Sequence, residues 1–169
     1  YGFDPRPKED VEGLAILPEM WRFDGNPPHY RKKKGKLLKY ATHEGPSEFI
    51  GTPVLVGARV YAAIGQDPQH GGGPGNLSVI DISKKKLTAT TIDFSAFNIR
   101  KDALTYTGAR VFGPNATVAQ DLEPEFITIS NDSNYAWVTL QENNAIATID
   151  LTTKTIIAVN GLGFKSFAS

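Results

Sequence analysis

Cysteine is the first residue type that this 169-residue sequence lacks. Its absence excludes disulfide bonds, thiolate metal sites and a cysteine nucleophile, although it does not identify a compartment. A net charge is lacking too, because 18 basic residues balance 18 acidic ones, so no global field attracts the protein to nucleic acid. No apolar run approaches the roughly 20 residues that a membrane-spanning helix needs. We therefore expect neither a nucleic-acid partner nor a membrane span.

The sequence does contain a pattern of short strands that occurs twice. Each copy has four segments rich in β-branched and aromatic residues, separated by turn residues. The first copy comprises residues 52–56, 59–64, 77–82 and 87–90, and the second comprises residues 123–129, 135–140, 145–151 and 155–159. Four short strands per repeat are typical of a β-propeller blade. The sequence therefore predicts an all-β, β-propeller-like fold.

The number of repeats limits this architecture. A closed propeller needs at least four blades of about forty residues, and only two are evident. We expect an incomplete ring or partial propeller, so that the chain is a fragment or a subunit that completes its stack against something else. Residues 1–48 are predicted to form an irregular N-terminal arm. Residues 49–169 are predicted to form the blades, with a loop or short-helix insertion at about 92–122.

A basic run lies in the predicted arm, where residues 31–36 read Arg-Lys-Lys-Lys-Gly-Lys. Such a run could bind phosphate or an acidic partner. The alternative is a solvated loop between strands, and it is favoured here because no aromatic residue interleaves with the lysines.

The two repeats differ most in the loop between their second and third strands. Residues 65–76 form this connection in the first repeat, whereas residues 141–144 suffice in the second. Glycine-rich backbone permits positive φ angles and close approach to a ligand, but no Gly-Lys-Ser/Thr ending marks a phosphate loop. The candidate ligand-loop residues are Asp67, His70, Gly71, Gly72 and Gly73.

Three acidic residues form a candidate calcium site. Asp121, Glu123 and Glu125 lie close together in sequence. Asn143 and Asn144 are expected to lie beside them and could add amide oxygens. Carboxylate and amide oxygens are the hard ligands that calcium prefers. In the alternative interpretation, the two glutamates share one face of a strand and Asp121 caps a turn.

Asp81 and Asp150 occupy equivalent places at the ends of the third strands, each before a polar turn. An aspartate there accepts backbone hydrogen bonds and closes the hairpin to the outermost strand, so we predict a structural role for both.

Three Asn-X-Ser/Thr triplets are candidate glycosylation sites. They begin at Asn76, Asn115 and Asn131, although chance occurrence is also plausible in a β-protein rich in Asn and Thr. No Gly-x-Ser-x-Gly motif accompanies the three histidines, and we assign no catalytic residue.

Two parts of the chain resemble known β-propeller families. Residues of about 17–76 resemble bacterial PQQ-like β-propeller repeat proteins, most specifically in the run Ile-Gly-Gln-Asp-Pro-Gln-His-Gly at 64–71. Residues of about 77–167 resemble choice-of-anchor I proteins, relatives of the mesenchyme-specific cell-surface glycoproteins. The runs that carry this second resemblance are residues 91–98, 110–125 and 138–147.

The first resemblance implies a quinone cofactor only where a family member keeps a calcium ion under a tryptophan floor. This chain has two tryptophans, Trp21 and Trp137, and no cysteine for a vicinal disulfide. We therefore do not expect PQQ binding, while calcium remains a candidate cofactor.

Together these features predict a non-enzymatic binding or scaffold protein that is secreted, periplasmic or at the cell surface. Its expected partners are a protein, a glycan or a mineral surface, within a possible larger complex or oligomer. The alternative is a fragment of a propeller enzyme, either a calcium-dependent phosphoesterase-like enzyme or a PQQ-dependent oxidoreductase.

Overall fold

The computed structural model describes a large part of the chain. The described residues are 2–3, 6, 8–9, 15–26, 28–29, 31–40, 42, 45–46, 51–64 and 75–167. The candidate ligand loop, comprising Asp67, His70, Gly71, Gly72 and Gly73, lies outside them.

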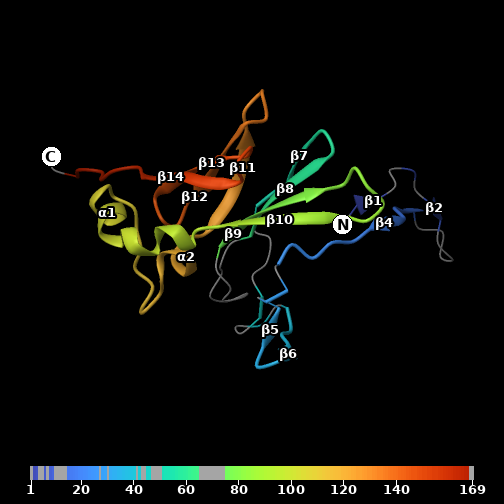
Figure 1. The fold of residues 1–169 in the computed structure, drawn as a ribbon, viewed down its shortest axis with the longest axis horizontal. Coiled ribbons are helices and arrows are strands. Elements are labelled where there is room, and N and C mark those ends of the chain that lie inside the picture. The colour runs from blue at the N-terminus through green and yellow to red at the C-terminus, as the bar shows by residue number, and fades with distance from the viewer. Residues whose placement is uncertain are drawn as a thin grey trace.

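Two four-stranded antiparallel sheets form the body of the molecule (Figure 1). The first sheet has the order β10-β9-β8-β7 and comprises β7 (Val54–Val56), β8 (Arg59–Ile64), β9 (Asn76–Asp81) and β10 (Thr88–Asp93). The second has the order β11-β12-β13-β14 and comprises β11 (Pro124–Ile129), β12 (Tyr135–Leu140), β13 (Ala145–Asp150) and β14 (Thr155–Gly161). The prediction of an all-β fold built from two four-stranded repeats is confirmed.

Alternation of side chains along the strands decides which face of the second sheet is buried. Along β12, Ala136, Val138 and Leu140 are fully buried, whereas Tyr135 and Trp137 are exposed. Successive side chains of a strand point to opposite faces, so this pattern gives the sheet one core face and one outer face.

The strand register allows the two sheets to be matched position by position. Asp81 of β9 lies opposite Arg59 of β8. In the second sheet, Asp150 of β13 lies opposite Tyr135 of β12 in the same way. Each aspartate is the last residue of its strand, so the two repeats have the same register.

The matched positions show that the sheets stack front to back. Tyr61 and Trp137 are equivalent, as are Ala62 and Val138. Tyr61 shares one hydrophobic cluster with Val138, whereas Ala62 is buried outside that cluster. The face of the first sheet that carries Tyr61 therefore packs on the face of the second sheet that carries Val138. The equivalent of this Val138 face in the first sheet is the face that carries Ala62.

The N-terminal segment lies against the remaining face of the first sheet. Ser78 shares this face with Ala62 and is completely buried, and its hydroxyl donates a 2.8 Å hydrogen bond to the carbonyl oxygen of Gly25. Gly25 and Asn26 are themselves buried. The first sheet is thus covered on both faces, and the second on one.

The two stacked sheets do not form a closed ring within the described residues. The propeller itself, and the domain boundaries at residues 48 and 49, remain predictions.

Short helices connect the two sheets. They are the 3-10 helix η1 (Ser95–Arg100) and the α-helices α1 (Lys101–Tyr106) and α2 (Val118–Asp121). Thr117 and Gln120 form a reciprocal capping box at the start of α2. Phe97, Leu104 and Val118 fix these helices to the common core. No helix in the described part of the chain is long and apolar enough to cross a membrane.

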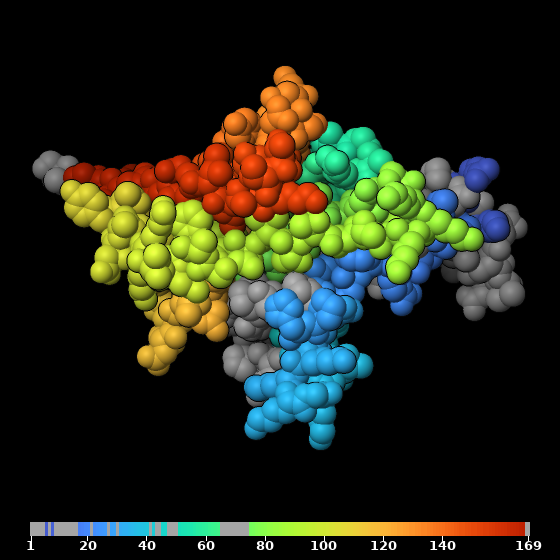
Figure 2. Space-filling model, in the orientation of Figure 1, coloured from blue at the N-terminus to red at the C-terminus, as the bar shows by residue number. Residues whose placement is uncertain are grey.

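Small two-stranded sheets occupy the N-terminal region. β1 (Gly2–Phe3) pairs with β4 (Glu19–Trp21), β2 (Lys8–Glu9) with β3 (Ala15–Ile16), and β5 (Lys32–Lys33) with β6 (Lys36–Leu37). The β5–β6 hairpin projects from the body in the space-filling view (Figure 2).

Candidate functional site

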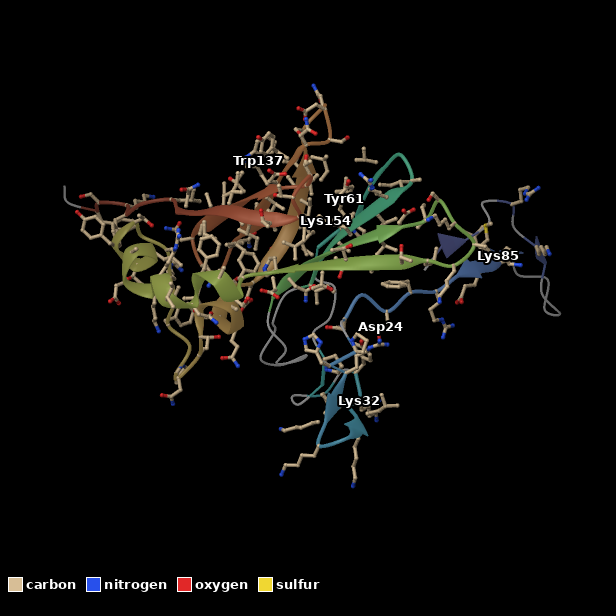
Figure 3. The ribbon with its side chains drawn as sticks, in the orientation of Figure 1. Asp24, Lys32, Tyr61, Lys85, Trp137 and Lys154 are labelled. Atoms are coloured by element: carbon tan, nitrogen blue, oxygen red, sulfur yellow. The ribbon has the colours of Figure 1, made fainter. Side chains whose placement is uncertain are left out.

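A polar groove lies where the turns of the two sheets meet. Its volume is about 450 Å³, and its charged lining residues are Arg59, Asp81, Asp132 and Lys154. Tyr61 forms part of the same lining, and Figure 3 places Tyr61 and Lys154 close to the junction of the sheets. A neighbouring hollow of about 390 Å³ shares Arg59 and Asp81 and extends to the β7–β8 turn.

Asp81 is fixed in the groove wall by the turn that follows β9. Its Oδ1 accepts a 2.8 Å hydrogen bond from the Ser83 backbone N–H and another from the Ser83 hydroxyl. These bonds, the hydroxyl first, lower the pKa of Asp81 below its ordinary value. The predicted turn-closing role of Asp81 is confirmed.

Asp132 is held in a similar manner at the β11–β12 turn. Its Oδ1 accepts hydrogen bonds from the Ser130 hydroxyl at 2.6 Å and the Asn134 backbone N–H at 3.0 Å. Its Oδ2 accepts a third from the Asn134 side-chain amide. The Ser130 hydroxyl makes the largest contribution to the lowered pKa of Asp132, which favours the ionised form.

Lys154 connects the two sheets across the groove. It has a positive φ of 57° in the β13–β14 turn, and its Nζ donates a 3.2 Å hydrogen bond to Thr90 Oγ1 of β10. The turn itself is closed by Asp150, whose Oδ1 accepts hydrogen bonds from the backbone N–H groups of Thr152 and Thr153. The Thr153 backbone bond is the main cause of the lowered pKa of Asp150, and its predicted structural role is confirmed.

The groove chemistry favours recognition of polar groups over proton transfer. Both carboxylates have lowered pKa values and already accept hydrogen bonds from their own turns. Arg59 is exposed, and within the described part of the chain its guanidinium makes no hydrogen bond. Arg59 therefore provides donors for an incoming acceptor group.

The predicted calcium ligands have separate roles in this structure. The carboxylate of Asp121 accepts hydrogen bonds from the backbone N–H groups of Phe112, at 2.9 Å, and Gly113, at 2.6 Å. Glu125 is nearly buried in β11, where burial first and the charge of Glu142 second raise its pKa. Across the described residues, no three Asp, Glu or His side chains form a group suited to a metal ion. Calcium binding by Asp121, Glu123 and Glu125 remains a prediction that this geometry does not favour.

The side chain of Asn143 holds two distant segments together, and the sequence pattern does not indicate this role. Its buried side chain donates to the carbonyl oxygens of Arg110 and Asp121, at 2.9 and 2.8 Å, and accepts from the Glu123 backbone N–H at 2.8 Å. It therefore joins the β12–β13 turn to the segment that precedes β11, and it is not available as a metal ligand in this arrangement. The neighbouring Asn144, with φ of 51°, bonds to the carbonyl oxygens of Gly108 and Gly163.

The three glycosylation candidates differ in exposure. Asn115 and Asn131 are exposed in turns. Asn76 is completely buried at the start of β9, beside Ser78. This packing does not favour a glycan on Asn76, and glycosylation at Asn76, Asn115 and Asn131 remains a prediction.

A second candidate surface is the outer face of the second sheet, here called the Trp137 face. Trp137 is 40% exposed there, although its equivalent Tyr61 is only 1% exposed. In register, Trp137 is flanked by Thr128 of β11 and Thr148 of β13. Tyr135 lies on the same face, two residues before Trp137. The face therefore combines aromatic and threonine side chains.

Comparison with known proteins supports one of the two resemblances. Residues 61–169 match the sequence profile of the choice-of-anchor I domain. No curated protein sequence matches the chain significantly. The PQQ-like resemblance of residues 17–76 remains a prediction.

Proposed function

Since this chain belongs to the choice-of-anchor I domain family, we propose that it is a scaffold whose Trp137 face extends a stack of β-sheets. Membership of the family indicates a cell-surface-related, non-enzymatic protein. The scaffold is secreted, periplasmic or held at the cell surface, and its turn-end groove is available to a polar group of a protein, glycan or mineral partner.

One observation carries this proposal, namely the unequal burial of two equivalent faces. The Tyr61 face is sealed because the second sheet packs on it, whereas the Trp137 face has no covering sheet among the described residues. The Val138 face and the Ala62 face of the chain are already covered, so the sheet face that a second copy can offer is its own Trp137 face. The expected occupant of the Trp137 face is therefore the same face of a second copy, in a two-fold contact of sheet on sheet.

The residue types on the Trp137 face suit such an occupant. Tyr135 and Trp137 are 41% and 40% exposed on this face, and the register places Ala158 of β14 opposite Thr148 on the same face. Exposed aromatic and aliphatic side chains gathered on one surface mark an interaction site more often than scattered ones do. Threonines beside Trp137 keep the face compatible with water before assembly.

The groove supports a binding role in addition to assembly. It is shaped by turns from both sheets, so stacking of the sheets creates it. Arg59 and Lys154 contribute two positive charges to the groove, and the turn-bound carboxylates of Asp81 and Asp132 contribute two negative ones. A partner group that accepts hydrogen bonds fits this set of donors.

Sedimentation velocity over a wide concentration range tests the stacking proposal. The wild-type chain is expected to associate as its concentration rises. Trp137→Glu is expected to weaken that association at least tenfold, because a carboxylate cannot be buried in an apolar interface without a partner. Trp137→Tyr installs the residue type found at the equivalent position of the first sheet and should retain association.

Ile99→Glu is the matched control, because Ile99 is 92% exposed in η1 and lies outside both sheets. It should associate like the wild type. A wild-type chain that stays monomeric throughout, or equal association of the two glutamate variants, would contradict the stacking role.

A further inference from the structure

The β5–β6 hairpin concentrates positive charge away from the body of the protein (Figures 1 and 2). Residues 31–39 contain one arginine and five lysines and no acidic residue. Lys32, Lys33, Lys34, Lys36 and Lys39 are all exposed. Because the whole chain has zero net charge, this hairpin gives the molecule a strongly asymmetric charge distribution.

The hairpin is anchored at its base by a polar cluster. Arg31 forms a 3.2 Å ion pair with Asp24, and the Tyr40 hydroxyl donates a 2.7 Å hydrogen bond to the same carboxylate. The Asn26 side-chain amide donates to the Tyr40 hydroxyl at 3.1 Å. Burial, followed by the bond to Asp24, raises the pKa of Tyr40 to about 12, so this donor keeps its proton at neutral pH. The lysines beyond the base thus lie on a hairpin whose base is held in place by these interactions.

The register of the hairpin places like charges opposite each other. Lys33 of β5 pairs with Lys36 of β6. The pairing of two lysines across the strands concentrates positive charge on this part of the hairpin. Lys34 and Gly35 form the turn with φ angles of 50° and 77°, which is the backbone that a two-residue hairpin with positive φ requires.

We propose that the β5–β6 hairpin binds an anionic polysaccharide, with Lys32, Lys33, Lys34 and Lys36 contacting its sulfate or carboxylate groups. The choice of a polysaccharide rests on the proposed extracellular or cell-surface location. Single-stranded nucleic acid is less well matched, because no aromatic side chain alternates with these lysines to stack on bases. A membrane surface is also less well matched, since Leu37 is the one apolar residue in the two strands.

Calorimetric titration with heparin, a sulfated polysaccharide, tests this proposal on the whole chain. The triple variant Lys32→Gln, Lys33→Gln, Lys36→Gln is expected to bind roughly tenfold more weakly or worse, and with a shallower salt dependence, because fewer counterions are released. The corresponding lysine-to-arginine variant should retain binding. Circular dichroism verifies that each variant is folded.

The matched control is Lys84→Gln, Lys85→Gln, Lys86→Gln, which removes the same charge from the β9–β10 turn. Figure 3 shows that Lys85 and Lys32 lie in separate parts of the molecule. This control should change heparin affinity less than threefold. Equal losses in the two triple variants, no heparin binding by the wild type, or tighter binding to DNA or to phosphatidylserine vesicles would each overturn the assignment. Self-association through the Trp137 face is measured by sedimentation and does not depend on heparin binding. Each of the two proposals can therefore fail without the other.

Discussion

At the scale of the residue, hydrogen-bonded side chains in turns determine much of this structure. Asp81 and Asp150 are the predictable examples, since an aspartate before a polar turn has a known local partner in the backbone. Asn143 could not be predicted in the same way. Its partners, the backbone groups of Arg110, Asp121 and Glu123, are 20 to 33 residues away, and no local pattern indicates them.

Replacing Asn143 should therefore be costly. Asn143→Ala removes three buried hydrogen bonds and leaves backbone groups unpaired, so we expect a loss of about 2–4 kcal/mol in the free energy of unfolding. Urea denaturation measures this loss. Asn160→Ala, at an exposed position of β14, is the control and should change stability by less than about 0.5 kcal/mol. Similar effects of the two substitutions would show that Asn143 does not hold these segments together.

Glu125 gives the protein a pH-dependent stability of known sign. Its pKa is raised in the folded state by burial first and by Glu142 second. The folded state therefore binds this proton more tightly than the unfolded state, so ionised Glu125 destabilises the fold above its folded pKa. That destabilisation decreases as the pH falls through the folded pKa of Glu125, and it is gone below the ordinary pKa of a glutamate carboxyl group.

Glu125→Gln should consequently raise the urea midpoint at neutral pH and leave it nearly unchanged at a pH below the ordinary pKa of a glutamate carboxyl group. Glu142→Gln should produce a smaller increase, because it removes only the secondary cause. A decrease in stability with Glu125→Gln at neutral pH would contradict this assignment.

At the scale of the element, the central strands were the most predictable part of the chain. The expected segments 59–64 and 135–140 coincide with β8 and β12. Their alternating or continuous apolar residues fix both position and type. The β5–β6 hairpin was harder to predict, because strands of two residues have no period to detect, and only the Lys34–Gly35 turn signals it.

The segment that follows β14 packs against the end of the loop after α1, and this contact depends on Gly108. Gly108 has φ of 92°, and a Cβ atom there would come within 2.6 Å of the Gly163 carbonyl oxygen. Asn144 bonds to the carbonyl oxygens of both glycines. This contact therefore needs both positive φ and close backbone approach at residue 108.

Gly108→Ala should lower the free energy of unfolding by about 2 kcal/mol or more, because strain and a backbone clash combine. Gly57→Ala is a matched control, since Gly57 has φ of 57° and open space around its Cβ position. It should cost only about 1 kcal/mol. Urea denaturation measures the free energy of unfolding of both variants. Equal losses of this free energy would exclude a role for the Gly163 contact.

At the scale of the whole molecule, the doubled strand pattern predicts two repeats but not what covers their faces. Alternation with a period of two indicates that one face of each sheet is buried. Tyr61 and Trp137 are aromatic residues at equivalent positions, so the sequence alone predicts the same burial for both. Only the three-dimensional stacking distinguishes a sealed Tyr61 from an exposed Trp137. Likewise, the sequence shows the basic run at residues 31–36 in a chain of zero net charge, but only the structure shows that this run forms a hairpin that projects from the body.

The central claim is that the Trp137 face receives another sheet, and the fluorescence of Trp137 tests it most directly. The chain has two tryptophans, so Trp21→Phe leaves Trp137 as the single reporter. With rising protein concentration, the stacking account predicts a blue-shifted emission and a marked loss of quenching by acrylamide. Emission and quenching that stay constant while the chain associates would place the contact elsewhere and contradict the account.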